Sequence, residues 1–170
     1  MSEEVAQNCI VSMAPSKTFN IAGFSSSLVI IPNKTKKARY ERATGVGHLH
    51  MGNIFGTVAT EAAYTHGDEW LEQMLTYLWE NYLLLEDFFK TNLPKVKVMK
   101  PEATYLIWLD FTEYGMKNKE LIEFTVKTAK VGLNDGGRFG NGGDGWLRIN
   151  IGCPKSILQE ALERLKKAFG

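Results

Sequence analysis

Lys17 is the residue of this sequence best placed for covalent chemistry. It lies in Ser16-Lys17-Thr18-Phe19-Asn20, shortly after the apolar run at residues 9–11. A β-branched run that stops at a polar patch is typical of a buried strand that places the following residues at the edge of a sheet. Removal from water lowers the pKa of a lysine from about 10.4 towards about 7–8, and the neutral amine is a nucleophile towards aldehydes. The alternative is a solvated lysine at the end of a strand.

Arg148 is the second candidate, because it interrupts an otherwise apolar, strand-like segment at residues 146–151. A guanidinium group binds a carboxylate through two parallel hydrogen bonds, which a lysine cannot do. An arginine in an apolar strand needs an anionic partner. That partner is either the carboxylate of a substrate, which we favour, or an internal side chain such as Asp110 or Asp144.

Hydrophobic periodicity, turn residues and capping residues predict the elements that position these two side chains. Before Pro94 we expect strands at residues 10–13 and 28–31 and helices at 34–43, capped by Asn33, at 53–66, and from Asp68 to Pro94. After Pro94 we expect strands at residues 96–99, 105–111 and 146–151 and helices at 121–130 and from 156 onward. Ser156 and Gln159 have the spacing of a capping box for the last helix.

This order of elements predicts an α/β fold that consists of a partial sheet, a long helix and a compact α+β subdomain. The strand at residues 10–13 has only the strand at 28–31 as a partner, whereas a buried parallel strand needs neighbours on both sides. The chain therefore reads as though it begins in the middle of a sheet.

Composition excludes several classes of protein. The net charge of +1, from 20 basic and 19 acidic residues, gives no electrostatic basis for binding nucleic acid. No apolar run approaches the roughly 18–20 residues of a membrane span, and the acidic N-terminus lacks the apolar core of a secretory signal. Cys9 and Cys153 read as reduced core thiols of a cytoplasmic protein. His48 and His50 have no cysteine or carboxylate at ligand spacing, so we expect no metal site.

Four segments, in order along the chain, resemble the class I/II aminotransferase family of fold-type I pyridoxal-phosphate (PLP) enzymes, and in particular its cystathionine β-lyase, or C–S lyase, subgroup. They are Ser16-Lys17-Thr18-Phe19-Asn20-Ile21-Ala22-Gly23, Asn53-Ile54-Phe55-Gly56 with Glu61-Ala62-Ala63-Tyr64, residues 100–111, and Leu133-Asn134-Asp135-Gly136 through residues 148–154. Together they span nearly the whole chain.

The resemblance implies a role for each candidate residue. Lys17 matches the lysine that forms a Schiff base with PLP and moves the α-proton of the substrate, and Arg148 matches the arginine that binds the α-carboxylate. Ser16 and Thr18 are positioned to donate to the phosphate of the cofactor, although their hydroxyls could instead satisfy the backbone of a turn. Two positions depart from the family pattern: Ala14 stands where many relatives have serine, and Ser25 where aminotransferases often have arginine. The second departure favours the lyase subgroup.

The resemblance also implies a domain organisation and a function. Residues 1–67 would be the C-terminal part of the PLP-binding large domain, 68–95 a connecting helix and 96–170 the small domain. The aspartate that pairs with the pyridine nitrogen, the aromatic residue that stacks on the ring and a phosphate-binding turn lie earlier in the family's chain, so we expect a fragment or one half of a split enzyme. We expect a cystathionine β-lyase-type C–S lyase acting on amino acids as a homodimer; the alternatives are a class I/II aminotransferase and a non-catalytic fragment.

Overall fold

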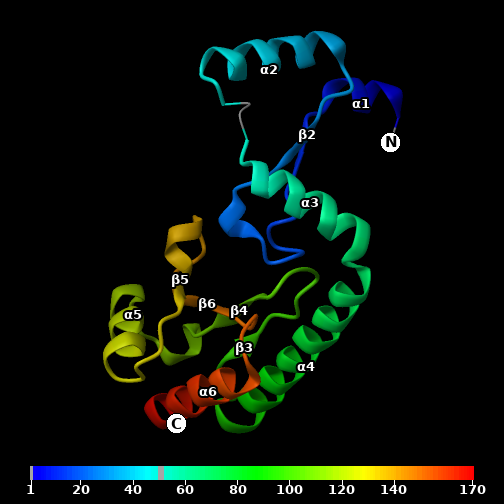
Figure 1. Ribbon diagram of the computed structural model, residues 1–170. Helices are drawn as coiled ribbons and strands as arrows, with labels where there is room; N and C mark the ends of the chain where they lie inside the picture. Colours follow the sequence, from blue (N-terminus) through cyan, green and yellow to red (C-terminus); the bar gives the residue numbers. More distant parts are fainter. Residues whose placement is uncertain (1, 50–51) are drawn as a thin grey trace. The chain divides into compact units, whose positions relative to one another are not determined.

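The computed structural model describes residues 2–49 and 52–170, and the chain divides into two compact units, Met1–Gln73 and Met74–Gly170 (Figure 1). We refer to them as the first unit and the second unit. The 25-residue helix α4, Asp68–Asn92, begins in the first unit and continues into the second.

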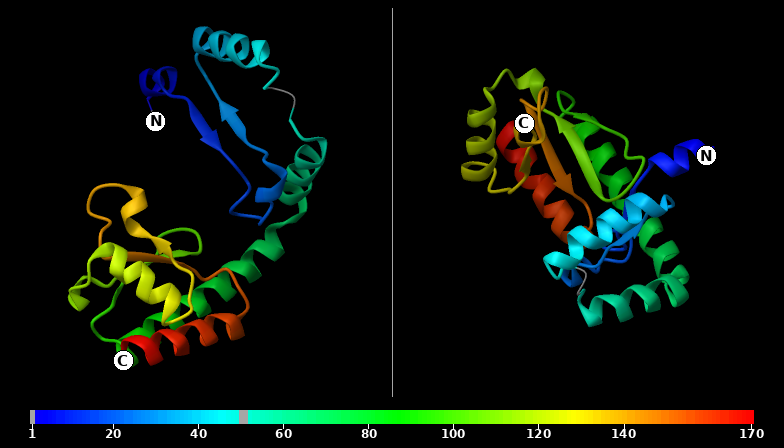
Figure 2. Two further views of the ribbon diagram at one scale, coloured as in Figure 1. Left: turned by 90° about the vertical axis from the view of Figure 1, so that its left-hand side faces the viewer. Right: turned by 90° about the horizontal axis from the view of Figure 1, so that it is seen from above.

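In the described residues the first unit consists of a two-stranded antiparallel sheet, four helical segments of its own and the start of α4. Strands β1, Val11–Met13, and β2, Leu28–Ile30, pair antiparallel, with Ser12 opposite Val29 (Figure 2). The helical segments besides α4 are α1 (Glu3–Asn8), the 3₁₀ helix η1 (Ala22–Phe24), α2 (Lys34–Val46) and α3 (Ile54–His66). The Asn33 side chain accepts a hydrogen bond of 3.0 Å from the Lys36 amide, which confirms the predicted cap of α2.

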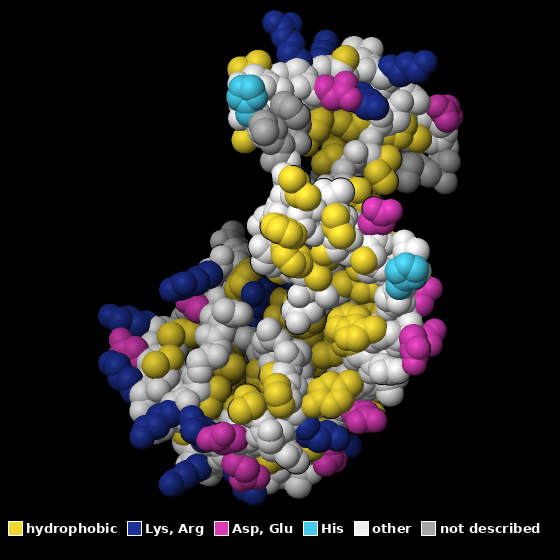
Figure 3. Space-filling view, in the orientation of Figure 1, with side chains coloured by type: hydrophobic (Ala, Val, Ile, Leu, Met, Phe, Trp, Pro, Cys, Tyr) yellow, Lys and Arg dark blue, Asp and Glu magenta, His cyan; other side chains and the backbone are white. Residues whose placement is uncertain are grey.

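The expectation of a buried parallel strand was wrong. All three residues of β1 are exposed, and its only partner in the described residues is the antiparallel strand β2. Within the described part of this unit, Phe19 is the one large hydrophobic side chain that is buried; its ring packs against Tyr64 and Trp70. The apolar residues of α3 face solvent instead, as Figure 3 shows, and Ile54 is 78% exposed.

The second unit contains a four-stranded antiparallel sheet in the order β3-β4-β6-β5. Its strands are β3 (Lys97–Val98), β4 (Leu106–Asp110), β5 (Asn134–Asp135) and β6 (Trp146–Asn150). Its helices, besides α4, are η2 (Thr112–Tyr114), α5 (Asn118–Lys127), η3 (Gly136–Phe139) and α6 (Lys155–Phe169).

One face of this sheet packs into a hydrophobic core beneath which α4 and α6 lie (Figures 1 and 2). Side chains alternate between the two faces of a strand, so β4 and β6 each send every second residue into this core. The central buried residues are Tyr82, Leu85 and Phe89 of α4, Ile107 and Leu109 of β4, Leu147 and Ile149 of β6, and Leu158, Leu162 and Leu165 of α6. The hydrophobic periodicity that predicted α4 and α6 is therefore confirmed for these residues, whereas Leu75 of α4, which shares the periodicity, is 55% exposed.

Two local predictions for the second unit were wrong. Helix α6 starts at Lys155 with Pro154 at its N-cap, and no side-chain hydrogen bond caps it, so Ser156 lies inside the first turn and forms no capping box. The short strand β5 was missed, since Asn134 and Asp135 read as turn residues.

In the described residues, no helix combines the length and apolar character that crossing a bilayer requires. Within the same residues, no group of three or more His, Cys, Asp or Glu side chains is arranged to hold a metal ion. His48 lies in the described part and His50 outside it.

Candidate functional site

Lys17 lies in a turn of the first unit. The turn covers residues 15–18 and is closed by a 2.9 Å hydrogen bond from the Phe19 amide to the Pro15 carbonyl. Pro15 and Phe19 are the buried residues at its two ends, so the turn is anchored on both sides while Lys17 points away from the packing.

The Lys17 side chain is exposed, which contradicts the expectation that a buried strand removes it from water. Ser16 and Thr18 are half-buried beside it. None of the three side chains has a hydrogen-bond or ion-pair partner among the residues that the structure describes. The turn therefore offers an uncommitted primary amine between two uncommitted hydroxyls.

These donor types fit PLP. A free primary amine can bind an aldehyde carbon covalently, and hydroxyls can donate hydrogen bonds to a phosphate. The hydroxyls of Ser16 and Thr18 are not used to satisfy the backbone of the turn, which was the alternative for them. Lys17 would hold the aldehyde, and Ser16 and Thr18 are the groups of this chain that would reach the phosphate.

Arg148 lies in the second unit, on the face of the sheet opposite to the core. In the register of the three neighbouring strands it stands between Trp108 of β4 and Asn134 of β5, so the three side chains form one row across the sheet. Its Nη2 donates a 3.2 Å hydrogen bond to Asn134 Oδ1. Its Nε is buried and has no hydrogen-bond partner. A buried donor without a partner costs free energy, and an anion that accepted from it would remove that cost.

Two aromatic rings hold the guanidinium group. The Arg148 Cζ lies 4.2 Å from the centroid of the Phe139 ring and 5.8 Å from that of the Trp108 ring. The two rings also contact each other edge to face, with centroids 5.2 Å apart. Contacts between a cation and ring faces restrict the guanidinium without neutralising its charge.

No carboxylate forms an ion pair with Arg148 in residues 2–49 and 52–170. Asp110, one of the two internal partners considered, instead accepts hydrogen bonds of 2.9 Å from the Thr112 amide and 2.6 Å from the Thr112 hydroxyl. Asp144, the other, forms no ion pair with any residue that the structure describes. Within the described residues, Arg148 is thus a half-buried cation whose one hydrogen-bond partner is a neutral amide.

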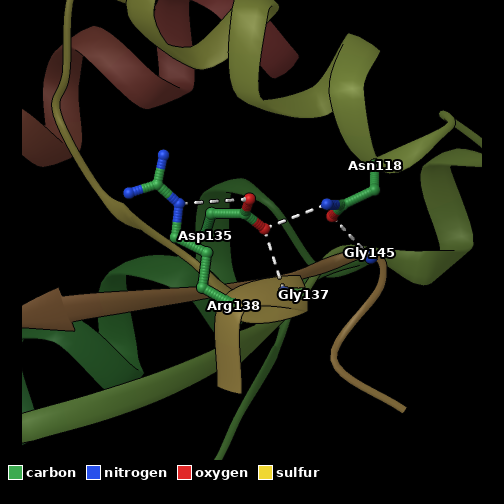
Figure 4. A network of polar contacts seen from close by, with 5 residues as sticks. All are labelled: Asn118, Asp135, Gly137, Arg138 and Gly145. Atoms are coloured by element: carbon green, nitrogen blue, oxygen red, sulfur yellow. Dashed lines mark hydrogen bonds and ion pairs between the residues drawn. The ribbon is translucent and has the colours of Figure 1, made fainter. Parts of the chain in front are cut away.

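A polar network fixes the loop that carries Phe139 (Figure 4). Asp135 Oδ1 accepts hydrogen bonds of 2.9 Å from the Gly137 amide and 2.9 Å from Asn118 Nδ2. Asn118 Oδ1 in turn accepts from the Gly145 amide at 3.2 Å. Asn118 therefore ties together the two ends of the glycine-rich loop between β5 and β6.

Trp108, Phe139 and Asn134 were missed as site residues by sequence reasoning. Trp108 and Asn134 lie on strands whose register with Arg148 could not be read from a single sequence, and Phe139 stood within a predicted loop. The sequence offered one signal for this site, an arginine inside an otherwise apolar strand, and that signal marked Arg148 alone. Lys17 belongs to the first unit and Arg148 to the second, so the surroundings of each residue are described within its own unit.

No protein-family model matches the chain. The chain is 44% identical to the cystathionine β-lyase PatB of Bacillus subtilis over 99% of its own length, and 33% identical to the cystathionine β-lyase of Corynebacterium glutamicum over 97%. It spans 44% of the length of each of these relatives. Among solved structures, cystalysin from Treponema denticola, which contains a pyridoxal 5'-phosphate cofactor, superposes with a TM-score of 0.92 at 36% identity, over 98% of this chain and 42% of cystalysin.

The fold and these matches define the class of protein: the chain corresponds to the C-terminal part of the fold-type I PLP-dependent enzymes. Both reaction classes occur among its relatives: the aspartate aminotransferase of Pyrococcus horikoshii is 27% identical over 96% of this chain, and a PLP-bound putative aminotransferase from Clostridium difficile superposes with a TM-score of 0.94 at 44% identity, over 99% of this chain and 44% of that one.

Proposed function

We propose that the chain supplies the cofactor lysine and the carboxylate-binding arginine of a PLP-dependent C–S β-lyase of the cystathionine β-lyase type. The observation that carries the proposal is the state of Arg148, a half-buried cation with a buried, unpartnered Nε and no carboxylate partner in the described residues. The α-carboxylate of an amino acid has the charge and the paired oxygens that such a guanidinium accepts. The identity to curated cystathionine β-lyases supports the lyase class.

In the proposed reaction this chain's residues bind the substrate and move protons. When bound, PLP withdraws electrons from the Cα of the substrate. Arg148 would hold the α-carboxylate and so fix the orientation of the Cα–H bond. Lys17 Nζ would hold the cofactor and then take the α-proton, after which the C–S bond at Cβ breaks and the thiolate leaves. With one water, the remaining three-carbon unit yields pyruvate and ammonia.

A chimera tests this proposal directly. Residues 1–170 would replace the corresponding C-terminal part of B. subtilis PatB, and pyruvate release from cystathionine would be measured with added PLP. We expect pyruvate from the chimera, none from its Lys17→Ala variant, and a KM raised at least about tenfold by Arg148→Lys, because lysine cannot make the paired contact. Lys34→Ala, at an exposed lysine of α2, is the matched control and should leave the rate unchanged.

The chimera also separates the alternatives. Borohydride reduction followed by peptide mass mapping should place the cofactor on Lys17. A chimera that carries cofactor on Lys17 and transfers the amino group to an oxo acid without releasing pyruvate would favour the aminotransferase, which shares both residues. A folded chimera without cofactor on Lys17 would make the chain a non-catalytic fragment and would refute the proposal.

We propose further that the active protein is a cytoplasmic homodimer, as the family resemblance implies. Light scattering on the chimera, compared with PatB itself, measures the assembly. A monomer with full activity would refute the dimer.

A further inference from the structure

The glycine-rich loop between β5 and β6 places one aromatic ring directly on the candidate arginine. Phe139 is the last residue of η3, and its ring centroid lies 4.2 Å from Arg148 Cζ. Its side chain is nevertheless 52% exposed, so this phenylalanine is not a core residue. Leaving half of a large apolar side chain in water gains little from burial, which points to a role in the contact with the guanidinium.

The guanidinium group is restrained from three directions by this arrangement. Phe139 covers it from the loop, Trp108 flanks it from β4, and Asn134 takes one of its Nη2 hydrogens from β5. An arginine side chain in water samples many rotamers, and binding a ligand restricts them. A guanidinium that is already held in one plane loses less of this freedom when it binds a carboxylate, so binding becomes tighter.

The loop can hold Phe139 in place because its base is closed. Asn118 bridges Asp135 and Gly145, and Asp135 also accepts from the Gly137 amide (Figure 4). Gly136 and Gly143 approach so closely that neither position has room for a Cβ atom. The two strands that flank this loop carry Asn134 and Arg148. The hydrogen bonds of Asn118 and Asp135 therefore fix the Phe139 ring and both of these polar side chains relative to one another.

We infer that Phe139 is a positioning residue for substrate binding: its ring holds the Arg148 guanidinium in the plane that receives the α-carboxylate of the amino-acid substrate. Asn118 and Asp135 contribute indirectly, because they fix the loop that carries Phe139. This inference rests on the proposed function, because it presupposes that Arg148 binds that carboxylate.

Nuclear magnetic resonance of the full chain with isotope-labelled arginine tests the contact itself. The ring current of Phe139 should shift the Arg148 Nε–H resonance away from those of exposed arginines, and Phe139→Leu should abolish the shift. Phe139→Tyr keeps a ring and should retain it. Phe55→Leu, which removes a 74% exposed ring of the first unit, is the matched control and should change nothing. An Arg148 resonance that is the same in the wild type and in Phe139→Leu would overturn the inference.

Titration with L-alanine then tests the consequence, with ethylamine as the probe that lacks a carboxylate. We expect L-alanine alone to move the Arg148 resonance, with an apparent Kd about tenfold weaker in Phe139→Leu and within about twofold of the wild type in Phe139→Tyr. Equal affinity in the wild type and in Phe139→Leu would overturn the positioning role alone. If L-alanine left Arg148 unmoved in the wild type although the ring-current shift is present, the carboxylate role of Arg148 would fail, and the inference with it.

In the PatB chimera the same variants should separate KM from kcat. Phe139→Leu should raise KM for cystathionine about tenfold and leave kcat within about threefold, because the ring acts on binding through Arg148. A fall in kcat at unchanged KM would contradict a role in carboxylate binding.

Discussion

At the scale of single residues, Tyr82 makes the stability of the second unit depend on pH. Its side chain is 2% exposed, and its hydroxyl donates a short hydrogen bond to the Glu86 carboxylate. Burial, and secondarily the bond and charge of Glu86, raise the pKa of Tyr82 from 10.0 to about 12. Because the folded pKa exceeds the unfolded one, the resulting stabilisation is complete below about pH 10 and is lost as the pH rises towards about 12.

We therefore expect the free energy of unfolding of the second unit to fall between about pH 10 and pH 12. Urea denaturation at a series of alkaline pH values measures this, and Tyr82→Phe should flatten the dependence. In a spectrophotometric titration one tyrosine should ionise only near pH 12. An unchanged alkaline slope in Tyr82→Phe would show that another group is responsible.

Asn81 is a second residue whose removal should be costly. It is fully buried on α4, and its Nδ2 donates hydrogen bonds of 2.9 Å to the Ile151 carbonyl and 3.1 Å to the Cys153 carbonyl. These two carbonyls follow the strand that carries Arg148. Asn81→Ala leaves both without this donor, so we expect a loss of about 2–4 kcal/mol in the free energy of unfolding.

Asn92→Ala is the matched control for Asn81, because Asn92 donates only to the Phe88 carbonyl of its own helix. Its cost should stay below about 1 kcal/mol. Similar losses in the two variants, measured by urea denaturation, would mean that the Asn81 bonds do not hold the segment after β6.

At the scale of elements, the loop between β5 and β6 depends on close backbone approach. A Cβ atom at Gly136 would lie 2.6 Å from the Trp146 carbonyl oxygen and would also overlap the Gly143 carbonyl oxygen. Gly136→Ala should therefore destabilise the second unit by about 1–3 kcal/mol and displace Phe139 from Arg148. Gly132→Ala, where a Cβ would meet nothing within 4 Å, should stay within about 0.5 kcal/mol of the wild type.

Denaturation measures the stability change of these two glycine variants, and the Arg148 Nε–H resonance reports the displacement. A Gly136→Ala variant with wild-type stability and an unmoved Arg148 resonance would show that the loop base can rearrange.

The same comparison of elements shows what the sequence could predict. Hydrophobic periodicity predicted the helices α4 and α6 that supply much of the core of the second unit, because burial imposes a period on the sequence. The apolar residues around Arg148 also marked this arginine as a candidate site residue. Its neighbours Trp108 and Asn134 depend on strand register, and Phe139 depends on the path of a loop; both are set by contacts between segments far apart in the sequence.

Local patterns misled where they lacked tertiary support. The run around Ile10 and Val11 is apolar enough for a buried strand, yet β1 is exposed and antiparallel to β2. Burial of a strand depends on what packs against it, and periodicity alone cannot supply that. The desolvation argued for Lys17 failed for the same reason, although the turn that holds this lysine is well anchored by Phe19.

At the scale of the whole molecule, the two units differ sharply in how much apolar surface they bury. Phe19 is the one member of the first unit among the hydrophobic core residues buried in the described part of the chain; the other 18 lie in the second unit. Exposed apolar residues crowd the first unit instead, among them Ile54, Phe55 and Val58 on α3 (Figure 3). Local stability follows buried apolar contact, so the first unit should open far more readily than the second.

Helices α2 and α6 make this a matched comparison, because they have 13 and 15 residues, and α6 buries three leucines while α2 buries no residue. Hydrogen exchange of the chain at low concentration, followed by mass spectrometry, should show the amides of α2 and α3 exchanging at least about a hundredfold faster than those of α6. Protection of α2 equal to that of α6 would contradict the expectation. The protection of α2 and α3 could instead rise with protein concentration while that of α6 stayed constant. That result would mean that copies of the chain associate through the exposed apolar surface of the first unit, as exposed patches of this kind do.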